Sequence, residues 1–344
     1  MTREAKTFER GLWHLLEQGR KQRAYPLASA WVAHEGRVVG HASVGAASER
    51  TRFDVASLTK PMAVVTLALR GVSEGWLDLE QPVATDLPAT ITPYTLLGHR
   101  AGLPAWRDLV AALPTPRVAG SSGARYAVDA LVRQAAREAD PNRGVEYSDL
   151  GFILLGRRLE ALTGRSLAEL VTVGSYRATR RARGDFAPTG VCPWRERELV
   201  GEVHDPNAWV MGGVAGHAGL FATASEVGRW ALGLERLAAE EVPFGGIDAG
   251  VLRAFWDPGQ RVGDATWVLG WDTPSKTGSS GGARVSELAV GHLGFTGTSV
   301  WIDRGQRLVV VLLSNRVALG ATAQAHLKAF RPRLHDGVRD LLGI

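Results

Sequence analysis

Apolar and polar residues form strand-like patterns near both ends of the chain. Residues 27–34 and 37–44 are two such runs, and Glu35-Gly36 between them predicts a hairpin turn. In the last quarter, β-branched and apolar runs separated by turn residues predict further strands at 265–271, 288–292, 298–303 and 308–314.

Apolar residues at helical spacing predict helices at 3–22, 57–76, 150–162, 225–239 and 325–341. Thr163-Gly164 ends the third of these, and the fourth is expected to begin at Ser225 with support from Glu226. Residues 82–125 are rich in proline, glycine and threonine, which favours loops with short helices. Strands at both ends with helices between them predict an α+β fold, in which the two termini build one sheet domain that holds a helical insertion.

The composition excludes several classes of protein. The 344 residues include 40 basic and 35 acidic side chains, but no long basic run, so we expect no nucleic-acid partner. No stretch reaches about 18 consecutive apolar residues, so no helix is expected to cross a membrane. Cys192 is the single cysteine and cannot form an internal disulfide, and we therefore expect a cytoplasmic location.

The first candidate for chemistry is Ser57-Leu58-Thr59-Lys60, at the start of a predicted helix. The spacing places the serine and lysine side chains on one face, where the lysine can take the serine proton if burial lowers its pKa. Lys60 is one of only five lysines among the 40 basic residues, and arginine could not act as this base. Any serine can precede a lysine by this spacing, so the pair alone is weak evidence.

Two further segments carry candidate groups. Tyr147-Ser148-Asp149 precedes the helix at 150–162, where the tyrosine can relay protons and Asp149 can hold Lys60 or a substrate amide. The alternative is an ordinary helix cap with a half-buried tyrosine. Residues 291–299 (GHLGFTGTS) lead into a strand, and their small residues let a substrate approach the backbone N–H groups. The alternative there is a glycine-rich bulge with a surface histidine.

Together these stretches resemble the serine β-lactamase and penicillin-binding-protein superfamily, in the branch of class C β-lactamases, family VIII esterases and D-aminopeptidases. The family signature is S-x-x-K, then Y-x-N, then K-T-G or H-x-G, in this order. The resemblance extends over nearly the whole chain and includes FDVASLTKPMAV, YSDLGFILLGRRLEALTG and GHLGFTGTSVWID. Residues 201–221 also resemble enzymes of peptidoglycan recycling, including N-acetylmuramoyl-L-alanine amidases.

This resemblance implies roles for particular residues. Ser57 would be the acylated nucleophile, and Lys60 and Tyr147 would share general acid and base work. The backbone N–H groups of Ser57 and of Phe295, which follows the motif glycine Gly294, would form the oxyanion hole. No metal or organic cofactor would be needed.

The resemblance also implies the domain layout. Residues 1–75 and 255–344 would form the sheet domain and residues 76–254 the helical domain, with the active site at their junction.

Two positions depart from the family pattern. Asp149 stands where most relatives have asparagine, and His292 stands where β-lactamases have a lysine that holds the substrate carboxylate. Both changes favour an amidase, peptidase or esterase acting on a peptidoglycan fragment or a related small molecule. The alternatives are a β-lactamase or D-Ala-D-Ala carboxypeptidase, or a non-catalytic sensor on the same scaffold. The expected partner is a small-molecule substrate, with no membrane, and the oligomeric state is left open.

Two other segments invite functional interpretations. Lys276-Thr277-Gly278 spells K-T-G, but no strand-forming residues follow it, so His292-Leu293-Gly294 is the preferred third motif. His204, Asp205 and His217 could suggest a metal site, yet their spacing matches no zinc motif. We expect the His204-Asp205 segment to contact the substrate or to order the cleft instead.

Overall fold

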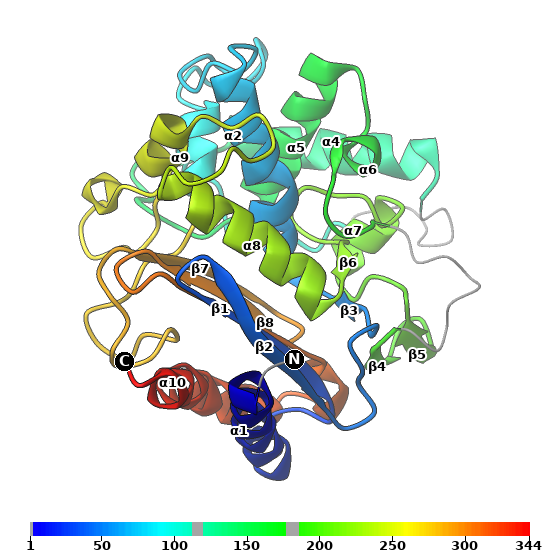
Figure 1. Ribbon diagram of the computed structural model, residues 1–344. Helices are drawn as coiled ribbons and strands as arrows, with labels where there is room; N and C mark the ends of the chain where they lie inside the picture. Colours follow the sequence, from blue (N-terminus) through cyan, green and yellow to red (C-terminus); the bar gives the residue numbers. More distant parts are fainter. Residues whose placement is uncertain (1–2, 112–119, 177–185) are drawn as a thin grey trace.

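Strands from the two ends of the chain pair in one antiparallel sheet. The structure is a computed structural model that describes residues 3–111, 120–176 and 186–344. Its main sheet has five strands in the order β2-β1-β9-β8-β7 (Figure 1). Their bounds are β1 Ala28–His34, β2 Arg37–Val44, β7 Ala289–Gly294, β8 Thr298–Asp303 and β9 Leu308–Ser314. The pairing of β1 with β9 joins the N-terminal hairpin to the C-terminal strands.

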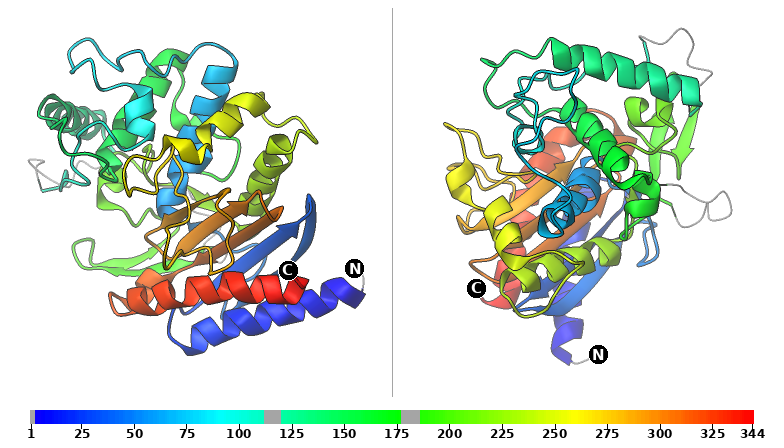
Figure 2. Two further views of the ribbon diagram at one scale, coloured as in Figure 1. Left: turned by 90° about the vertical axis from the view of Figure 1, so that its left-hand side faces the viewer. Right: turned by 90° about the horizontal axis from the view of Figure 1, so that it is seen from above.

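Helices cover both faces of this sheet, which explains its continuous apolar strands. Helices α1 (Arg3–Lys21) and α10 (Ala323–Leu342) lie side by side on one face, and α8 (Ala224–Ala238) lies on the other (Figures 1 and 2). Successive side chains of a strand point to opposite faces, so Val310 packs with the first pair and Val309 and Val311 pack with α8.

The remaining helices lie beyond α8, on the side of the sheet away from the termini (Figure 2). Their bounds are α2 Thr66–Ser73, α3 Pro93–Leu97, α4 Ser122–Arg137, α5 Asp149–Thr163, α6 Leu167–Leu170, α7 Pro206–Val210 and α9 Ala249–Phe255. Two small sheets pair β3 (Phe53–Asp54) with β6 (Phe221–Ala222), and β4 (Pro188–Cys192) with β5 (Arg197–Val200). The predicted α+β fold, an antiparallel sheet flanked by helices, is confirmed.

Three details of the sequence prediction are wrong or incomplete. Residues 265–271 form no strand, because Gly270 adopts a φ of 80° and turns the chain, leaving one isolated bridge between Trp267 and Asp272. Helix α8 begins after Thr223 rather than at Ser225, since Thr223 and Glu226 form a reciprocal capping box. Helix α4 falls largely outside the ranges predicted as helical.

The helices of the described chain are short or amphipathic. Among residues 3–111, 120–176 and 186–344, none is both long enough and apolar enough to cross a lipid bilayer.

Candidate active site

Ser57 lies in a tight turn that the surrounding chain holds from several sides. It belongs to the 3₁₀ turn Ala56–Leu58 that follows β3, and Ala56 before it has a left-handed φ of 48°. Such a backbone costs energy in a residue other than glycine, so the surroundings must stabilise it. The Asp54 carboxylate accepts the Ala56 N–H at 2.8 Å, and the Thr298 hydroxyl donates to the Val55 carbonyl at 2.9 Å.

Lys60 follows Ser57 on a π-helical segment, Lys60–Val65, which continues into α2. Its side chain is fully buried and its Nζ lies 3.1 Å from the Ser57 hydroxyl oxygen. The same ammonium donates to the Asp149 carboxylate at 2.6 Å and to the His217 carbonyl at 3.3 Å. Three acceptors therefore fix one cation directly beside the serine.

Tyr147 and Asp149 reach the lysine from the beginning of α5. Ser148 caps this helix by accepting the Gly151 N–H, which places Tyr147 just before the helix and Asp149 in its first turn. The Tyr147 ring centre lies 4.7 Å from Lys60 Nζ, and the ring packs against both His99 and Trp267. The helix cap that the sequence suggested thus also brings both side chains to Lys60.

The electrostatics of the lysine differ from the expectation. Burial by itself would lower the pKa of Lys60, but the Asp149 carboxylate and Tyr147 outweigh it and raise that pKa above its usual value. This direction favours the protonated form of Lys60 at rest, so the condition that burial lowers its pKa is not met. Burial also raises the pKa of Tyr147, and Asp149 adds to the rise while Lys60 opposes it. Both groups hold their protons in the resting site.

The third motif lies on β7, an edge strand of the main sheet beside the serine turn. His292 is buried, and burial, with help from Lys60, lowers its pKa to about 3, so it is neutral at physiological pH. Its Nδ1 lies 2.9 Å from the Leu293 carbonyl, and a carbonyl can only accept, so Nδ1 carries the proton. Nε2 is then an acceptor with no partner among the described residues.

Gly294 and Phe295 end β7 next to the serine turn. A Cβ on Gly294 would lie 2.6 Å from the Val55 carbonyl, so only glycine allows β7 to approach this closely. Phe295 follows with a side chain that is 60% exposed. This contact brings the backbone of Phe295 near the turn that carries Ser57.

The His204-Asp205 segment also lines the site, and the His204 ring centre lies 5.6 Å from that of Phe295. His204 donates its backbone N–H to Asp54 at 2.7 Å, and Asp205 caps α7 and accepts from His217 Nε2 at 2.9 Å. Burial raises the pKa of Asp205, but its contact with His217 outweighs this and the net shift is downward. Within the described ranges, no three His, Cys, Asp or Glu side chains gather as metal ligands.

One cavity of about 910 Å³ connects these groups. Its lining includes the side chains or backbone of Ser57, Tyr147, Asp149, His204, Asp205, His217, His292, Gly294 and Phe295. Ser275 and Gly278 also line it, but the Lys276 side chain between them is 91% exposed and lies 3.7 Å from Asp264. The K-T-G at 276–278 is thus a surface loop.

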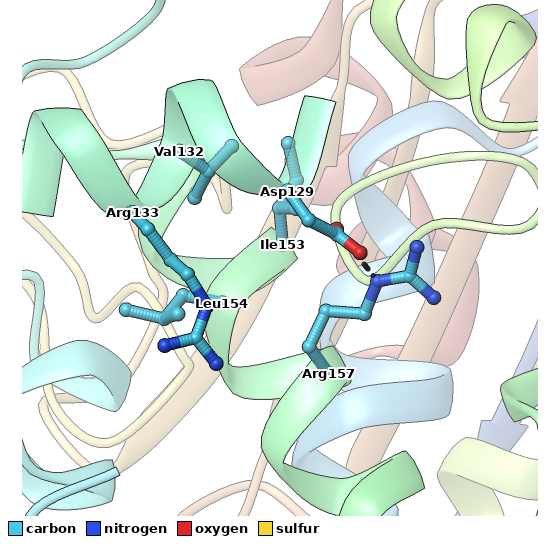
Figure 3. Close-up of a pocket in the computed structure, with 6 residues that line it drawn as sticks. All are labelled: Asp129, Val132, Arg133, Ile153, Leu154 and Arg157. Carbon is cyan, nitrogen blue, oxygen red and sulfur yellow. Dashed lines mark hydrogen bonds and ion pairs between the residues drawn. The ribbon is translucent and has the colours of Figure 1, made fainter. Parts of the chain in front are cut away.

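A second, smaller cavity of about 280 Å³ lies between α4 and α5. Figure 3 shows the six residues that line this cavity. Among them, Arg157 donates to the Asp129 carboxylate at 2.8 Å. They are Asp129, Val132, Arg133, Ile153, Leu154 and Arg157. This lining contains no hydroxyl, thiol or imidazole, so the cavity at Ser57 is the candidate active site.

The sequence analysis missed Asp54 and His99. Asp54 is 1% exposed and joins the serine turn to the His204 backbone, while His99 packs under Tyr147 and accepts the Ser148 N–H at 3.1 Å. For Asp54, the sequence offered one signal, a single carboxylate between apolar residues in FDVAS.

Comparisons with known proteins place the chain in a family. The sequence model of the Beta-lactamase family matches residues 12–330. An N-acetylmuramyl-L-alanine amidase of Bacillus subtilis (strain 168) is 29% identical, over 85% of this chain and 77% of that protein. A putative D-alanyl-D-alanine carboxypeptidase of Salmonella gallinarum is 27% identical, over 78% of this chain and 70% of that protein.

Solved structures show the same fold. A β-lactamase from Sulfitobacter sp. EE-36 superposes with a TM-score of 0.71 at 18% identity, covering 98% of this chain and 99% of that one. An octameric penicillin-binding protein homologue from Pyrococcus abyssi superposes with a TM-score of 0.70 at 16% identity, covering 96% of this chain and 77% of that one.

Proposed function

Because the chain belongs to the Beta-lactamase family and is a serine hydrolase, we propose that Ser57 is its nucleophile and that it cleaves an amide or ester bond in a peptidoglycan-derived or related small molecule. The observation that carries this proposal is the contact of the buried Lys60 ammonium with the Ser57 hydroxyl at 3.1 Å, where Ser57 lines a large cavity. The expected acyl-enzyme forms when the serine oxygen attacks the substrate carbonyl.

The proton balance of this step assigns a role to Asp149. Lys60 is protonated at rest and must release a proton before it can accept one from Ser57. The Asp149 carboxylate, at 2.6 Å, is the nearest acceptor, and it takes this proton as substrate displaces water from the cleft. Neutral Lys60 then accepts the Ser57 proton as the new carbon–oxygen bond forms. The backbone N–H groups of Ser57 and Phe295 are the proposed donors to the oxyanion.

Collapse of the tetrahedral intermediate breaks the bond to the leaving group. Lys60 returns a proton through the Tyr147 hydroxyl to the departing amine or alcohol, and Asp149 returns its proton to Lys60. A water molecule then attacks the acyl-enzyme by the same route and regenerates Ser57. Each proton taken from a nucleophile is thus delivered to a leaving group.

The proposed substrate class rests on the site and on the relatives. The names of the two curated relatives describe an amidase of N-acetylmuramyl-L-alanine and a putative D-alanyl-D-alanine carboxypeptidase. His292 is neutral and so does not supply the cation expected of a β-lactamase. Trp106 lines the cavity with a 43% exposed side chain, which suits stacking on a sugar ring. An amidase is therefore preferred over a β-lactamase.

A parallel screen tests this preference. Purified protein and its Ser57→Ala variant are assayed with a muropeptide, a D-alanyl-D-alanine peptide, p-nitrophenyl acetate and a chromogenic cephalosporin. We expect Ser57-dependent cleavage of the muropeptide amide and of the ester, and slower cleavage of the cephalosporin. Faster cleavage of the D-alanyl-D-alanine peptide than of the muropeptide would indicate a carboxypeptidase instead. Faster cleavage of the cephalosporin would indicate a β-lactamase. A stable adduct without turnover would instead indicate a sensor.

The location of the protein is a separate part of the proposal. We keep a cytoplasmic location, which rests on the sequence alone, and fractionation of the producing cell tests it.

The third motif has its own test. His292→Ala is expected to lower kcat/KM by about 10- to 100-fold, because it removes a buried acceptor from the cleft. Lys276→Ala is the matched control, since its side chain is 91% exposed, and is expected to change kcat/KM by less than about twofold. The opposite result, with Lys276→Ala inactive and His292→Ala intact, would assign the third motif to residues 276–278.

A further inference from the structure

Cationic side chains also line the cavity at Ser57. Arg316, from the 3₁₀ turn Arg316–Leu319 after β9, and Lys328 and Arg331, from α10, all line it. Arg316 is 4% exposed and Arg331 is 9% exposed, whereas Lys328 lies at the surface. Two guanidinium groups are therefore buried in the wall of a substrate-sized cavity.

Both guanidinium groups are held by the turn that joins β7 to β8. Arg316 donates to the Phe295 carbonyl, with its Nε at 3.2 Å, and its guanidinium lies over the Phe295 ring. Arg331 donates to the Thr298 carbonyl at 2.8 Å. The two cations thus sit at the two ends of the turn that carries the proposed oxyanion donor.

No carboxylate in the described part of the chain neutralises this pair. Arg316 and Arg331 bond only to backbone carbonyls there, and the Nε of Arg331 is buried without a hydrogen-bond partner. Burial, together with the nearby Arg316, lowers the pKa of Arg331 to about 10. Buried charges are normally paired, because an unpaired one loses its hydration without compensation.

An unpaired buried cation in the wall of an active-site cavity is suited to an anion that arrives with the substrate. We propose that Arg316 and Arg331 form a subsite for a carboxylate of the substrate. A planar carboxylate can accept from the free N–H groups of the guanidinium fork, which is the preferred geometry of this pair. This inference rests on the proposed function only in taking the cavity as the substrate site, and it narrows the substrate class to molecules with a free carboxylate.

The subsite also explains how a site with a neutral His292 can still select an acidic substrate. Burial and Lys60 keep His292 uncharged, so the third motif contributes an acceptor rather than a cation. The positive charge is supplied instead from Arg316 and Arg331, on the far side of the Gly294–Thr298 turn.

Binding without turnover tests the proposal. In a Ser57→Ala background, isothermal titration compares N-acetylmuramoyl-L-alanine with its carboxamide, which differ only in the carboxylate. We expect the carboxylate to bind at least about 10-fold more tightly, with a preference that weakens as salt is added. Arg331→Gln and Arg316→Gln should each reduce this preference to about twofold or less. Arg333→Gln is the matched control, because Arg333 is an exposed residue of the same helix that bonds Gln22, and it should keep the full preference.

Each other outcome counts against the subsite. Equal affinity for the two probes, or no binding of the carboxylate, would overturn it, and so would a preference that survives both substitutions. If one of the two arginine variants fails to fold, as judged by its thermal transition, the other variant still decides. Because no bond is cleaved, a failure of the proposed hydrolysis would be seen separately, in the loss of Ser57-dependent turnover.

Discussion

At the scale of single residues, the candidate active site depends on hydrogen bonds of a few buried charged groups. The Lys60 ammonium donates to the Asp149 carboxylate, and the Asp54 carboxylate accepts backbone N–H groups of the serine turn and of His204. The S-x-x-K spacing and the resemblance to a family predicted that Ser57, Lys60 and Tyr147 belong to one site, and the structure brings their side chains together. The sequence could not predict the pKa of Lys60, which is set by Asp149, 89 residues further along the chain.

Asp149→Asn tests the ion pair. Removing the carboxylate leaves a buried ammonium without its counter-ion, so we expect the free energy of unfolding to fall by about 3 kcal/mol. The pKa of Lys60 should also fall, because Asp149 is what raises it. We expect kcat at neutral pH to drop by about 100-fold and to recover partly as the pH rises and Lys60 loses its proton.

Denaturant unfolding and a pH profile of kcat measure both effects. Asp129→Asn is the control, since Asp129 also bonds an arginine, Arg157 (Figure 3), but its side chain is 32% exposed. The Asp129→Asn substitution should lower the free energy of unfolding by less than about 1 kcal/mol and leave kcat unchanged. An Asp149→Asn protein with native kcat would show that Asp149 does not accept the proton of Lys60.

Asp54→Asn tests the support of the serine turn. Burial raises the pKa of Asp54 to about 6, with a further rise from Asp205, and the N–H groups of His204 and Ala56 and the Arg195 charge limit the rise. As the pH falls below about 6, the carboxylate gains a proton and one of its two N–H bonds weakens. We therefore expect kcat/KM of the native protein to decline on the acid side near pH 6.

The substitution should lower kcat/KM by about 10-fold, because an amide offers one acceptor oxygen where the carboxylate offers two. The acid decline near pH 6 should disappear in the same variant. Asp248→Asn is the matched control, since Asp248 also accepts a backbone N–H, that of Val251 at 2.9 Å, as a helix cap away from the site. An unchanged acid decline in Asp54→Asn would assign it to another group, such as Asp272, which also lines the cavity and whose pKa burial raises to about 6.

At the scale of elements, the periodicity of apolar residues predicted those helices and strands that depend on residues close together in the sequence. The hairpin of β1 and β2 and the strands β8 and β9 lie where strand-like apolar runs predicted them, and α5, with its glycine cap at Gly164, lies where the helical spacing of apolar residues predicted it. The predicted strand at 265–271 fails, because an apolar run cannot distinguish a strand from a buried turn. Close approaches between elements were also not predictable from the sequence.

Gly216→Ala tests one such approach. Gly216 lies between α7 and β6, and a Cβ there would overlap the carbonyl oxygen of Phe152 in α5 and lie 3.2 Å from Val64. We expect the free energy of unfolding to fall by about 2–3 kcal/mol, because neither backbone can move freely. The neighbouring His217 carbonyl binds Lys60, so kcat should fall as well.

Gly123→Ala provides the control, as the nearest atom to its new Cβ is the Ser121 side-chain oxygen at 3.8 Å. It lies in α4, where alanine favours the helix, so stability should stay the same or rise by up to about 1 kcal/mol. Guanidinium unfolding of both variants measures the difference. Equal stability of the two would mean that the segment at Gly216 can shift without cost.

At the scale of the whole molecule, the site is assembled from parts that are distant in the sequence. Ser57 and Lys60 come from the segment after the first hairpin, Tyr147 and Asp149 from α5, and His292 from the edge strand β7. The order of the three motifs indicated that these parts belong together, through resemblance to a family. The contacts that join them, such as Gly294 against Val55, appear only in the folded chain.

The central claim is that Ser57 carries the acyl group. Brief reaction of the purified protein with p-nitrophenyl acetate, quenched with acid and followed by peptide mass spectrometry, measures this directly. We expect one acetyl group on the peptide that contains Ser57 in the native protein, and none on that peptide in the Ser57→Ala variant. An acetyl group on a different residue, or full esterase turnover by the Ser57→Ala variant, would contradict the claim.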